Sequence, residues 1–280
     1  MKRFLLFLGA FVAGMLAALL AAGLMLLPGW LQERELQNQR PQAVAASATP
    51  TPTPTPTPPP ALPQMDFTDL LAQNPDVVGW ITIPDTQIDY PVLQGTDNEF
   101  YLRHGLDGAY DIVGIPFADY ECDVQNGRHL ILYGHNMGVD ETDRFSTLQG
   151  YKDPDYYTQH PYIELYTLYG STYYKVVAVY ALTARTQDAD YFAFNTYADF
   201  ASDEAEQQYL DEVARRAFYT TGDYARPGER LLTLCTCTYE MDDARILVMA
   251  RPLREGESLA ADTVNVNADP LLPARWPAGA

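Results

Sequence analysis

The chain has 280 residues, a formal net charge of −19 at pH 7 and a hydrophobic content of 47%. This length allows one domain of ordinary size with additional segments. Such an acidic chain repels phosphate backbones, which argues against nucleic-acid binding. The three cysteines, at positions 122, 235 and 237, are too few for a disulfide scaffold, and the 20 tyrosines and 11 phenylalanines favour a β-rich fold.

The N-terminal segment of the chain is apolar, with no charged residue between positions 4 and 27. As a helix it would be about 36 Å long, which exceeds the ~30 Å hydrocarbon core of a bilayer. Lys2 and Arg3 precede it, and basic residues stay on the cytoplasmic side. We therefore predict a single-pass membrane anchor at residues 1–30 with the rest of the chain outside the cell. A cleaved signal peptide is the alternative, although its apolar region is usually only about 7–15 residues long.

Residues 31–65 are predicted to be an extracellular linker rich in threonine and proline. Five consecutive Thr-Pro dipeptides occupy residues 49–58. Proline lacks a backbone donor, so this run cannot join a helix or a sheet. We expect an extended polyproline II spacer or a disordered tether.

The folded domain is predicted to span residues 66–254 and to be mainly β. It opens with a capped amphipathic helix at residues 66–71, which ends before Pro75. Eight short strands follow, and a closed barrel would leave none of their edges unpaired. The predicted strands are 77–84, 88–93, 114–118, 129–133, 162–168, 173–182, 230–237 and 245–252. A helix with 3.6-residue apolar spacing at residues 199–218 separates the sixth and seventh strands. The tail, residues 255–280, shows no periodicity and is expected to be mostly disordered.

Cys237 ends an apolar β run that begins at Leu231, and the sequence then turns polar. A cysteine at the end of a strand is held in place and remains accessible, as a nucleophile must be. A buried structural cysteine is the alternative, because free cysteines are often buried. The position of Cys237 alone does not decide between the two.

Two further residues carry suitable chemistry at the ends of predicted strands. His135 directly follows an apolar strand, and imidazole is the usual proton shuttle near neutral pH, although a structural histidine is the alternative. Arg245 opens the last strand eight residues after Cys237, so a hairpin would place the two side by side. A guanidinium there could donate hydrogen bonds to an oxyanion. A surface ion pair of Arg245 with Asp242 or Asp243 is the alternative.

Taken together, these segments resemble the sortase family. Residues 233–237, Thr-Leu-Cys-Thr-Cys, resemble the sortase motif Thr-Leu-X-Thr-Cys. Residues 133–136 resemble the segment that carries the family's histidine, and residues 244–248 resemble its arginine strand. Residues 74–81 and 88–92 also resemble the opening of sortase domains. The resemblance implies an eight-stranded sortase-like β-barrel with an N-terminal helix.

The resemblance also implies a catalytic role for each of three residues. Cys237 would attack the carbonyl of a sorting-signal peptide of a secreted protein, Arg245 would stabilise the oxyanion, and His135 would transfer protons. The resulting thioacyl enzyme would pass its acyl group to an amine of peptidoglycan or of a pilin lysine. This chemistry needs no metal and no other cofactor. The alternatives are a pilin-polymerising sortase, a purely hydrolytic cysteine peptidase and a non-catalytic tethered surface domain.

The two predicted helices resemble those of class B sortases, which implies a signal of the Asn-Pro-X-Thr type, with Leu-Pro-X-Thr types left open. Residues 97–102 resemble a class B segment that lines the substrate groove. The resemblance therefore implies that Asn98 and Leu102 bind substrate, and it assigns Thr236 to the groove as the motif threonine. Cys235 takes the variable position of the motif. Side chains two apart on a strand share one face, so Cys235 should lie near Cys237.

Overall fold

The computed structural model describes residues 33–44, 59–138 and 140–277. The predicted anchor at residues 1–30 and the whole Thr-Pro run at residues 49–58 lie outside them. Among the described residues, no helix is long and apolar enough to cross a membrane. The longest of these helices, α4 (Asp203–Arg216), has 14 residues, or about 21 Å, which is shorter than the ~30 Å core of a bilayer. The predicted single-pass membrane localisation is therefore corrected, because the described chain provides no anchor for it.

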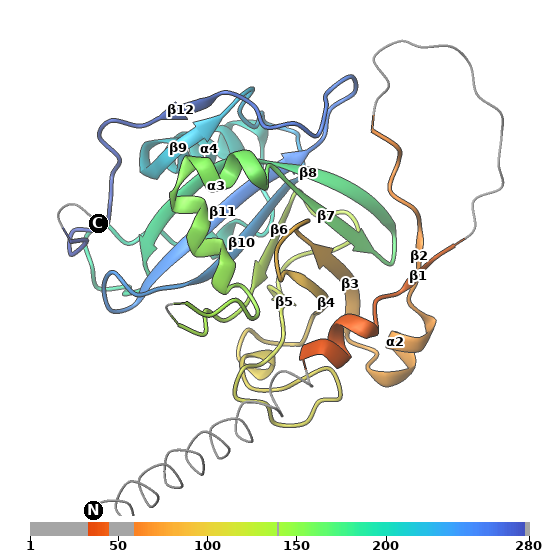
Figure 1. The fold of residues 1–280 in the computed structure, drawn as a ribbon. Coiled ribbons are helices and arrows are strands. Elements are labelled where there is room, and N and C mark those ends of the chain that lie inside the picture. The colour runs from red at the N-terminus through yellow and green to blue at the C-terminus, as the bar shows by residue number, and fades with distance from the viewer. Residues whose placement is uncertain (1–32, 45–58, 139, 278–280) are drawn as a thin grey trace, which may run out of the picture. The chain divides into compact units, whose positions relative to one another are not determined.

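Eight strands close into a barrel, as the sequence predicts (Figure 1). The order around the barrel is β11-β10-β6-β5-β4-β3-β7-β8, and β8 pairs back to β11. Two neighbouring pairs, β4–β5 and β6–β10, are parallel, and the other pairs are antiparallel. The strands are β3 (Val77–Thr82), β4 (Asp89–Leu93), β5 (Phe117–Ala118), β6 (His129–Tyr133), β7 (Tyr162–Thr167), β8 (Gly170–Thr183), β10 (Leu231–Thr238) and β11 (Ala244–Pro252). Each of the eight overlaps one predicted strand.

The apolar run of β8 is nearly continuous because both faces of this strand are covered. Val176 and Val179 belong to the cluster inside the barrel, whereas Val177 and Tyr180 belong to a second cluster outside it. The second cluster also contains apolar residues of α4, such as Leu210. A strand buried on both faces loses the simple alternation of polar and apolar residues.

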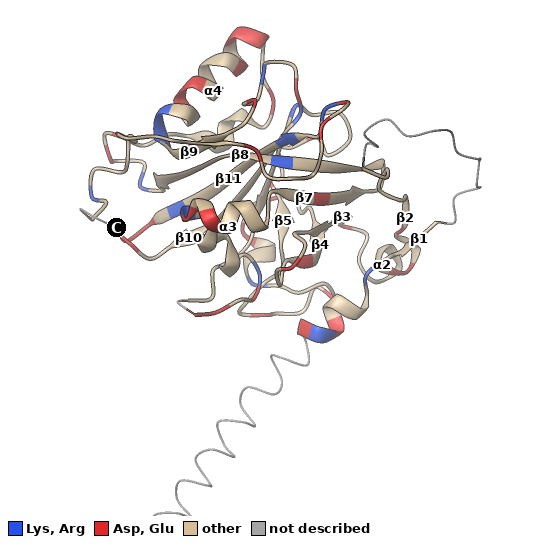
Figure 2. Ribbon diagram, turned by 45° about the horizontal axis from the view of Figure 1, so that its top comes forward, with Lys and Arg blue, Asp and Glu red and all other residues tan. Residues whose placement is uncertain are grey.

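The helix α4 follows the sixth barrel strand, as predicted, and carries its own start signals. The side chain of Ser202 accepts a hydrogen bond from the backbone N–H of Ala205, which caps the helix. Acidic residues occupy its first turn and Arg215 and Arg216 its last, which suits the helix dipole (Figure 2). The helix ends two residues before the predicted boundary because Ala217 begins strand β9 (Ala217–Thr221), which pairs with β8 beyond β7.

Shorter helices connect the strands. The helix expected at residues 66–71 is α2 (Thr68–Gln73), and α3 (Pro154–Gln159) was not predicted. The described residues also include three 3₁₀ helices: η1 (Phe100–Leu102), η2 (Ser146–Lys152) and η3 (Phe194–Tyr197). Two short strands, β1 (Gln42–Ala43) and β2 (Met65–Asp66), pair with each other. The predicted boundaries of the linker, 31–65, and of the folded domain, 66–254, stay predictions.

The tail differs from the sequence-based expectation of disorder. Residues 264–266 form strand β12 (Val264–Val266), which pairs antiparallel with β9. Figure 1 shows this segment, in dark blue, running beside β9. The free edge of β9 offers unpaired backbone groups to the tail. Local periodicity could not reveal this pairing, because the partner edge exists only after the barrel has formed.

Candidate active site

Cys237 and Arg245 face each other across the β10–β11 ladder. The two residues are direct partners in the antiparallel register. Residues paired in this way have Cβ atoms about 4.5–5.5 Å apart. The side-by-side placement expected from the hairpin is therefore present, and both side chains line the same pocket.

His135 reaches this pocket because β6 runs parallel to β10. The ladder joins Tyr133 to Cys235, and the N–H of Gly134 then donates to the carbonyl oxygen of Cys235 at 3.2 Å. Gly134 packs directly on Phe145, so a Cβ at this position would lie 2.6 Å from the ring. A glycine is thus required for the chain to deliver His135 beside the end of β10.

The imidazole of His135 is held by one hydrogen bond, and its surroundings disfavour its charged form. Its Nε2 lies 2.8 Å from the carbonyl oxygen of Leu102. A carbonyl can only accept, so Nε2 carries the proton and Nδ1 is free to exchange one. Burial lowers the pKa of His135, and the charges of Arg103, Arg144 and Arg245 lower it further, against the opposing effect of the Leu102 carbonyl.

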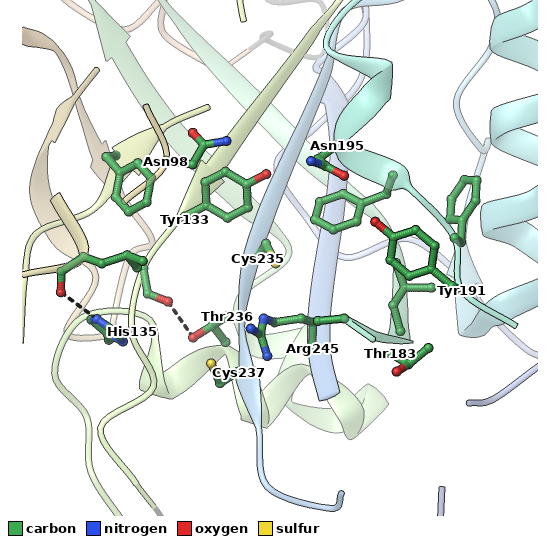
Figure 3. A pocket seen from close by; sticks show the side chains of 17 residues that line it. Asn98, Tyr133, His135, Thr183, Tyr191, Asn195, Cys235, Thr236, Cys237 and Arg245 are labelled. Carbon is green, nitrogen blue, oxygen red and sulfur yellow. Dashed lines mark hydrogen bonds between the residues drawn. The ribbon is translucent and has the colours of Figure 1, made fainter. Parts of the chain in front are cut away.

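The three residues share a pocket of about 380 Å³ with the three groove residues that the sequence predicts. In Figure 3 the side chain of Cys237 lies between those of His135 and Arg245. Asn98 and Tyr133 lie on one side of the pocket and Tyr191 and Asn195 on the other. Its lining consists of Asn98, Leu102, Phe117, Tyr133, Gly134, His135, Leu182, Thr183, Ala184, Tyr191, Phe192, Phe194, Asn195, Cys235, Thr236, Cys237 and Arg245.

Two amides fix the backbone at Cys237. Asn136 Nδ2 and Gln149 Nε2 both donate to the carbonyl oxygen of Cys237, at 3.0 Å and 2.9 Å. Tyr239 Oη in turn donates to the carbonyl oxygen of Asn136 at 2.8 Å. The position of the Cys237 backbone is therefore set by the segment after β6 and by η2. Sequence reasoning missed Gln149, since its contact with Cys237 spans 88 residues.

Asp119 is a second residue that sequence reasoning missed. Its carboxylate is fully buried and accepts from Asn98 Nδ2 at 2.9 Å and from Tyr133 Oη at 2.7 Å. Asn98 also accepts, through Oδ1, from the N–H of Tyr120 at 3.1 Å. These bonds determine the orientation of the Asn98 amide toward the pocket. No motif marks Asp119, although an acidic residue directly after an apolar strand is a signal that could have singled it out.

Thr236 and Cys235 precede Cys237 on β10 and differ in what their side chains do. Thr236 Oγ1 donates to the carbonyl oxygen of Gly134 at 2.7 Å, and the residue is 2% exposed. This bond ties β10 to the segment that carries His135. Cys235 lines the same pocket as Cys237, near which the sequence places it, and burial raises the pKa of its thiol to about 12, against the opposing effect of Arg245. Cys235 is therefore a neutral thiol at physiological pH.

Among the residues that the structure describes, no group of three His, Cys, Asp or Glu side chains could hold a metal ion. The groups that converge on the pocket are a thiol, an imidazole and a guanidinium. They can supply a nucleophile, a proton carrier and an oxyanion donor, respectively.

Known proteins share both the sequence and the fold. A family model described as "Sortase domain" matches residues 81–253. Sortase B of Staphylococcus aureus is 33% identical over 191 residues, which cover 67% of this chain and 75% of that protein. Sortase B of Listeria monocytogenes is 34% identical over 180 residues, which cover 63% of this chain and 69% of that protein.

Solved structures agree with these matches. The X-ray structure of Clostridium perfringens sortase B has a TM-score of 0.61 and 29% identity, and the match covers 68% of this chain and all of that chain. A Staphylococcus aureus sortase B–substrate complex has a TM-score of 0.60 and 32% identity, with 68% of this chain and 85% of that chain covered. The chain therefore belongs to the sortase family of cysteine transpeptidases, which sort proteins to the cell wall, and within that family it is class B-like.

Proposed function

We propose that this sortase cleaves the sorting signal of secreted proteins through a thioacyl intermediate on Cys237 and transfers the acyl group to an amine. The observation that carries the proposal is the register of β10 and β11, which pairs Cys237 with Arg245 in the pocket that also holds His135. A thiol nucleophile, a proton carrier and an oxyanion donor are the parts that acyl transfer requires.

In the first half-reaction, Cys237 Sγ bonds to the carbonyl carbon of the peptide while its proton passes to His135. Arg245 donates hydrogen bonds to the oxygen that becomes negatively charged. The tetrahedral intermediate collapses, the C–N bond breaks, and His135 returns the proton to the leaving amine. Since Nε2 is held by the carbonyl of Leu102, Nδ1 is the atom that carries this proton.

In the second half-reaction, an amine attacks the thioacyl carbon and gives its proton to His135. The C–S bond breaks and Cys237 recovers its proton. Peptidoglycan amines and pilin lysines are both acceptors of this chemical class. Two solved structures of sortase B support the two kinds of substrate: one is a substrate complex of the Staphylococcus aureus protein, and the other is a complex with triglycine.

The peptide is proposed to bind along Asn98, Leu102 and Thr236, all of which line the pocket. The Asn98 amide is presented by Asp119, whose bonds to it are described above. Asn98 can therefore offer a hydrogen-bonding edge of fixed orientation to the peptide. The carbonyl of Leu102 is already bonded to His135, so it is the side chain of Leu102 that is left to contact the peptide.

Mass spectrometry of the full chain tests this function. The protein is incubated with peptides of the Asn-Pro-X-Thr and Leu-Pro-X-Thr types, with and without triglycine. We expect an acyl adduct on the proteolytic fragment that contains Cys237, and a peptide–triglycine product only when triglycine is present. Cys237→Ala should abolish both, whereas Cys122→Ala, which removes a buried thiol outside the pocket, should retain both.

Two results would count against the proposal. If no peptide is cleaved and no adduct forms on Cys237, the enzymatic function is wrong. If cleavage occurs but triglycine is never incorporated, the protein is a hydrolytic peptidase.

A further inference from the structure

The C-terminal tail lies beyond the region that matches the family model, which ends at residue 253. Residues 267–277, named the C-terminal strap below, follow β12 and run back toward the active site. The N–H of Asn267 donates to the carbonyl oxygen of Phe218 at 2.9 Å, and that of Leu271 to the carbonyl oxygen of Arg215 at 2.9 Å. The ring of Trp276 packs on Phe218 with centroids 6.0 Å apart. The strap is thus fastened to α4 and β9 along most of its length.

One wall of the substrate pocket is formed by a segment that belongs to no strand. Residues 185–197, named the pocket loop below, supply four lining residues: Tyr191, Phe192, Phe194 and Asn195. The backbone hydrogen bonds donated within this loop are local. They run from Asp188 to Arg185, from Tyr191 to Asp188, from Phe194 to Phe192 and from Thr196 to Ala193. The loop therefore has no ladder of its own to hold the wall in place.

The strap makes two polar contacts with this loop. The N–H of Ala274 donates to Asp190 Oδ2 at 2.8 Å, and Arg275 Nη2 donates to Asp188 Oδ2 at 3.3 Å. Asp188 also accepts from the hydroxyl of Thr183, a pocket residue, at 2.8 Å. The strap thus contacts the loop just before its lining residues begin.

Arg275 also contacts the hairpin that carries the reactive residues. The same Nη2 lies 3.2 Å from the carbonyl oxygen of Asp242, in the turn between β10 and β11. That turn separates Cys237 from Arg245 along the chain. One guanidinium therefore connects the pocket loop to the catalytic hairpin, and a segment outside the family domain links two sides of the pocket.

We propose that the C-terminal strap positions the pocket loop, and that Arg275 is the positioning residue through which it sets the affinity for the peptide. Neither Arg275 nor Ala274 lines the pocket, so neither takes part in bond breaking. That the bound ligand is a sorting-signal peptide rests on the proposed function. The contacts by which the strap positions the loop do not depend on that function.

We expect the loss of a single contact to change KM less than the loss of the whole strap, because each contact is partly exposed. The side chain of Arg275 is 39% exposed, and a pair of this kind contributes little by itself. Arg275→Ala should therefore raise KM for the peptide about two- to five-fold and change kcat by less than about two-fold. Removal of residues 268–280 should raise KM by about ten-fold or more, since it deletes both contacts with the loop. Arg275→Lys should fall between wild type and Arg275→Ala, because lysine keeps the positive charge, but its shorter side chain does not bring a nitrogen to the position of Nη2.

The experiment combines peptide kinetics with hydrogen exchange of the full chain. Amides of residues 185–197 should exchange faster in Arg275→Ala and in the truncated chain, while amides of β10 and β11 stay unchanged. Arg226→Ala is the matched control, because Arg226 is an exposed arginine that is paired with Asp223 and lies outside the pocket. It should leave both KM and the exchange of the pocket loop as in wild type.

The outcomes separate this proposal from the proposed function. If Arg275→Ala and the truncation lower the melting temperature but leave KM and loop exchange unchanged, the strap is purely structural and the proposal is overturned. If wild type cleaves no peptide, the proposed function fails, and the exchange of residues 185–197 alone then decides whether the strap holds the loop.

Discussion

The side chain of Arg245 is directed into the pocket by the pairing of Arg245 with Cys237 and by a hydrogen bond to the neighbouring backbone. Its Nη1 donates to the carbonyl oxygen of Ala244 at 3.0 Å, which limits the positions that the guanidinium can take. The meeting of Cys237, His135 and Arg245 in one pocket could be predicted from sequence, because each lies at or just after the end of a predicted strand and their segments together resemble the sortase family. Gln149 could not, since its contact with Cys237 joins segments that local patterns do not connect, and for Asp119 the sequence offered only its place directly after an apolar strand.

Arg245→Lys should lower kcat for peptide cleavage about 100-fold with little change in KM. Lysine keeps the charge but loses the planar fork of donors, and loss of one oxyanion donor costs about 10²–10³ in kcat. Steady-state kinetics measures the effect, with Arg215→Lys, a change in an exposed arginine of α4, as the control. A rise in KM with kcat unchanged would show instead that Arg245 serves peptide binding.

His135 should titrate below the ordinary histidine pKa of about 6.5, because burial and three cationic neighbours disfavour its charged form. In Arg245→Ala the pKa of His135 should rise, since one of these charges is removed. Titration of the ring by NMR in a Cys237→Ala background follows both values. The acidic limb of the pH profile of kcat/KM should have its midpoint below 6.5 as well. A His135 pKa above 6.5 in the otherwise unchanged protein would contradict this assignment.

At the scale of elements, the parallel pairing of β6 with β10 brings the histidine segment to the cysteine strand. The eight barrel strands were predictable because apolar runs and turn residues mark each of them. The strands β9 and β12 were not, since β9 continues an apparently helical pattern and β12 depends on the edge that β9 provides. The 3₁₀ helix η2, which positions Gln149, has no apolar periodicity that could have revealed it.

Gly134→Ala should destabilise the fold by about 1–3 kcal/mol, the usual cost of overpacking a core. The added Cβ would lie 2.6 Å from the ring of Phe145, which is fully buried and cannot retreat into solvent. Urea unfolding measures the loss, and kcat should fall as His135 is displaced. Gly170→Ala is the matched control, because a Cβ there meets nothing within 4 Å. An equal effect of the two substitutions would contradict the steric explanation.

At the scale of the whole molecule, the C-terminal tail is attached to the barrel by ion pairs as well as by the pairing of β12 with β9. Arg251, at the end of β11, is 1% exposed and is paired in a bidentate manner with Glu257, at 2.7 Å and 2.6 Å. Arg254 pairs with Glu229, between α4 and β10. Sequence alone could not predict this arrangement, because the charged residues of the tail have no fixed spacing from their partners in the barrel.

Stability should fall in acid as Glu257 becomes protonated. Burial raises the pKa of Glu257, but the hydrogen bonds from Arg251 and from the N–H of Arg254, with nearby charges, outweigh it and lower the pKa to about 2. A carboxyl whose pKa is lower in the folded state stabilises the fold above its unfolded pKa of about 4.5, and this contribution is lost as the pH falls toward about 2.

Glu257→Gln tests this linkage, because it leaves the buried Arg251 without its charged partner. The free energy of unfolding at pH 7 should fall by about 3 kcal/mol. The difference in the free energy of unfolding between the variant and wild type should shrink as the pH falls from about 4.5 to about 2. Urea unfolding at a series of pH values follows both effects, with Glu255→Gln, a change in an exposed glutamate of the same tail, as the control. A difference that stays constant over this range would contradict the assigned pKa.

The parallel pairing of β6 with β10 joins residues that are about 100 positions apart in the chain. Contacts of such high sequence separation form late, since the loop between them must close first. Cys237 and His135 are therefore brought to one pocket only when β6 pairs with β10. A chain that lacks this pairing would hold the thiol of Cys237 apart from the imidazole of His135.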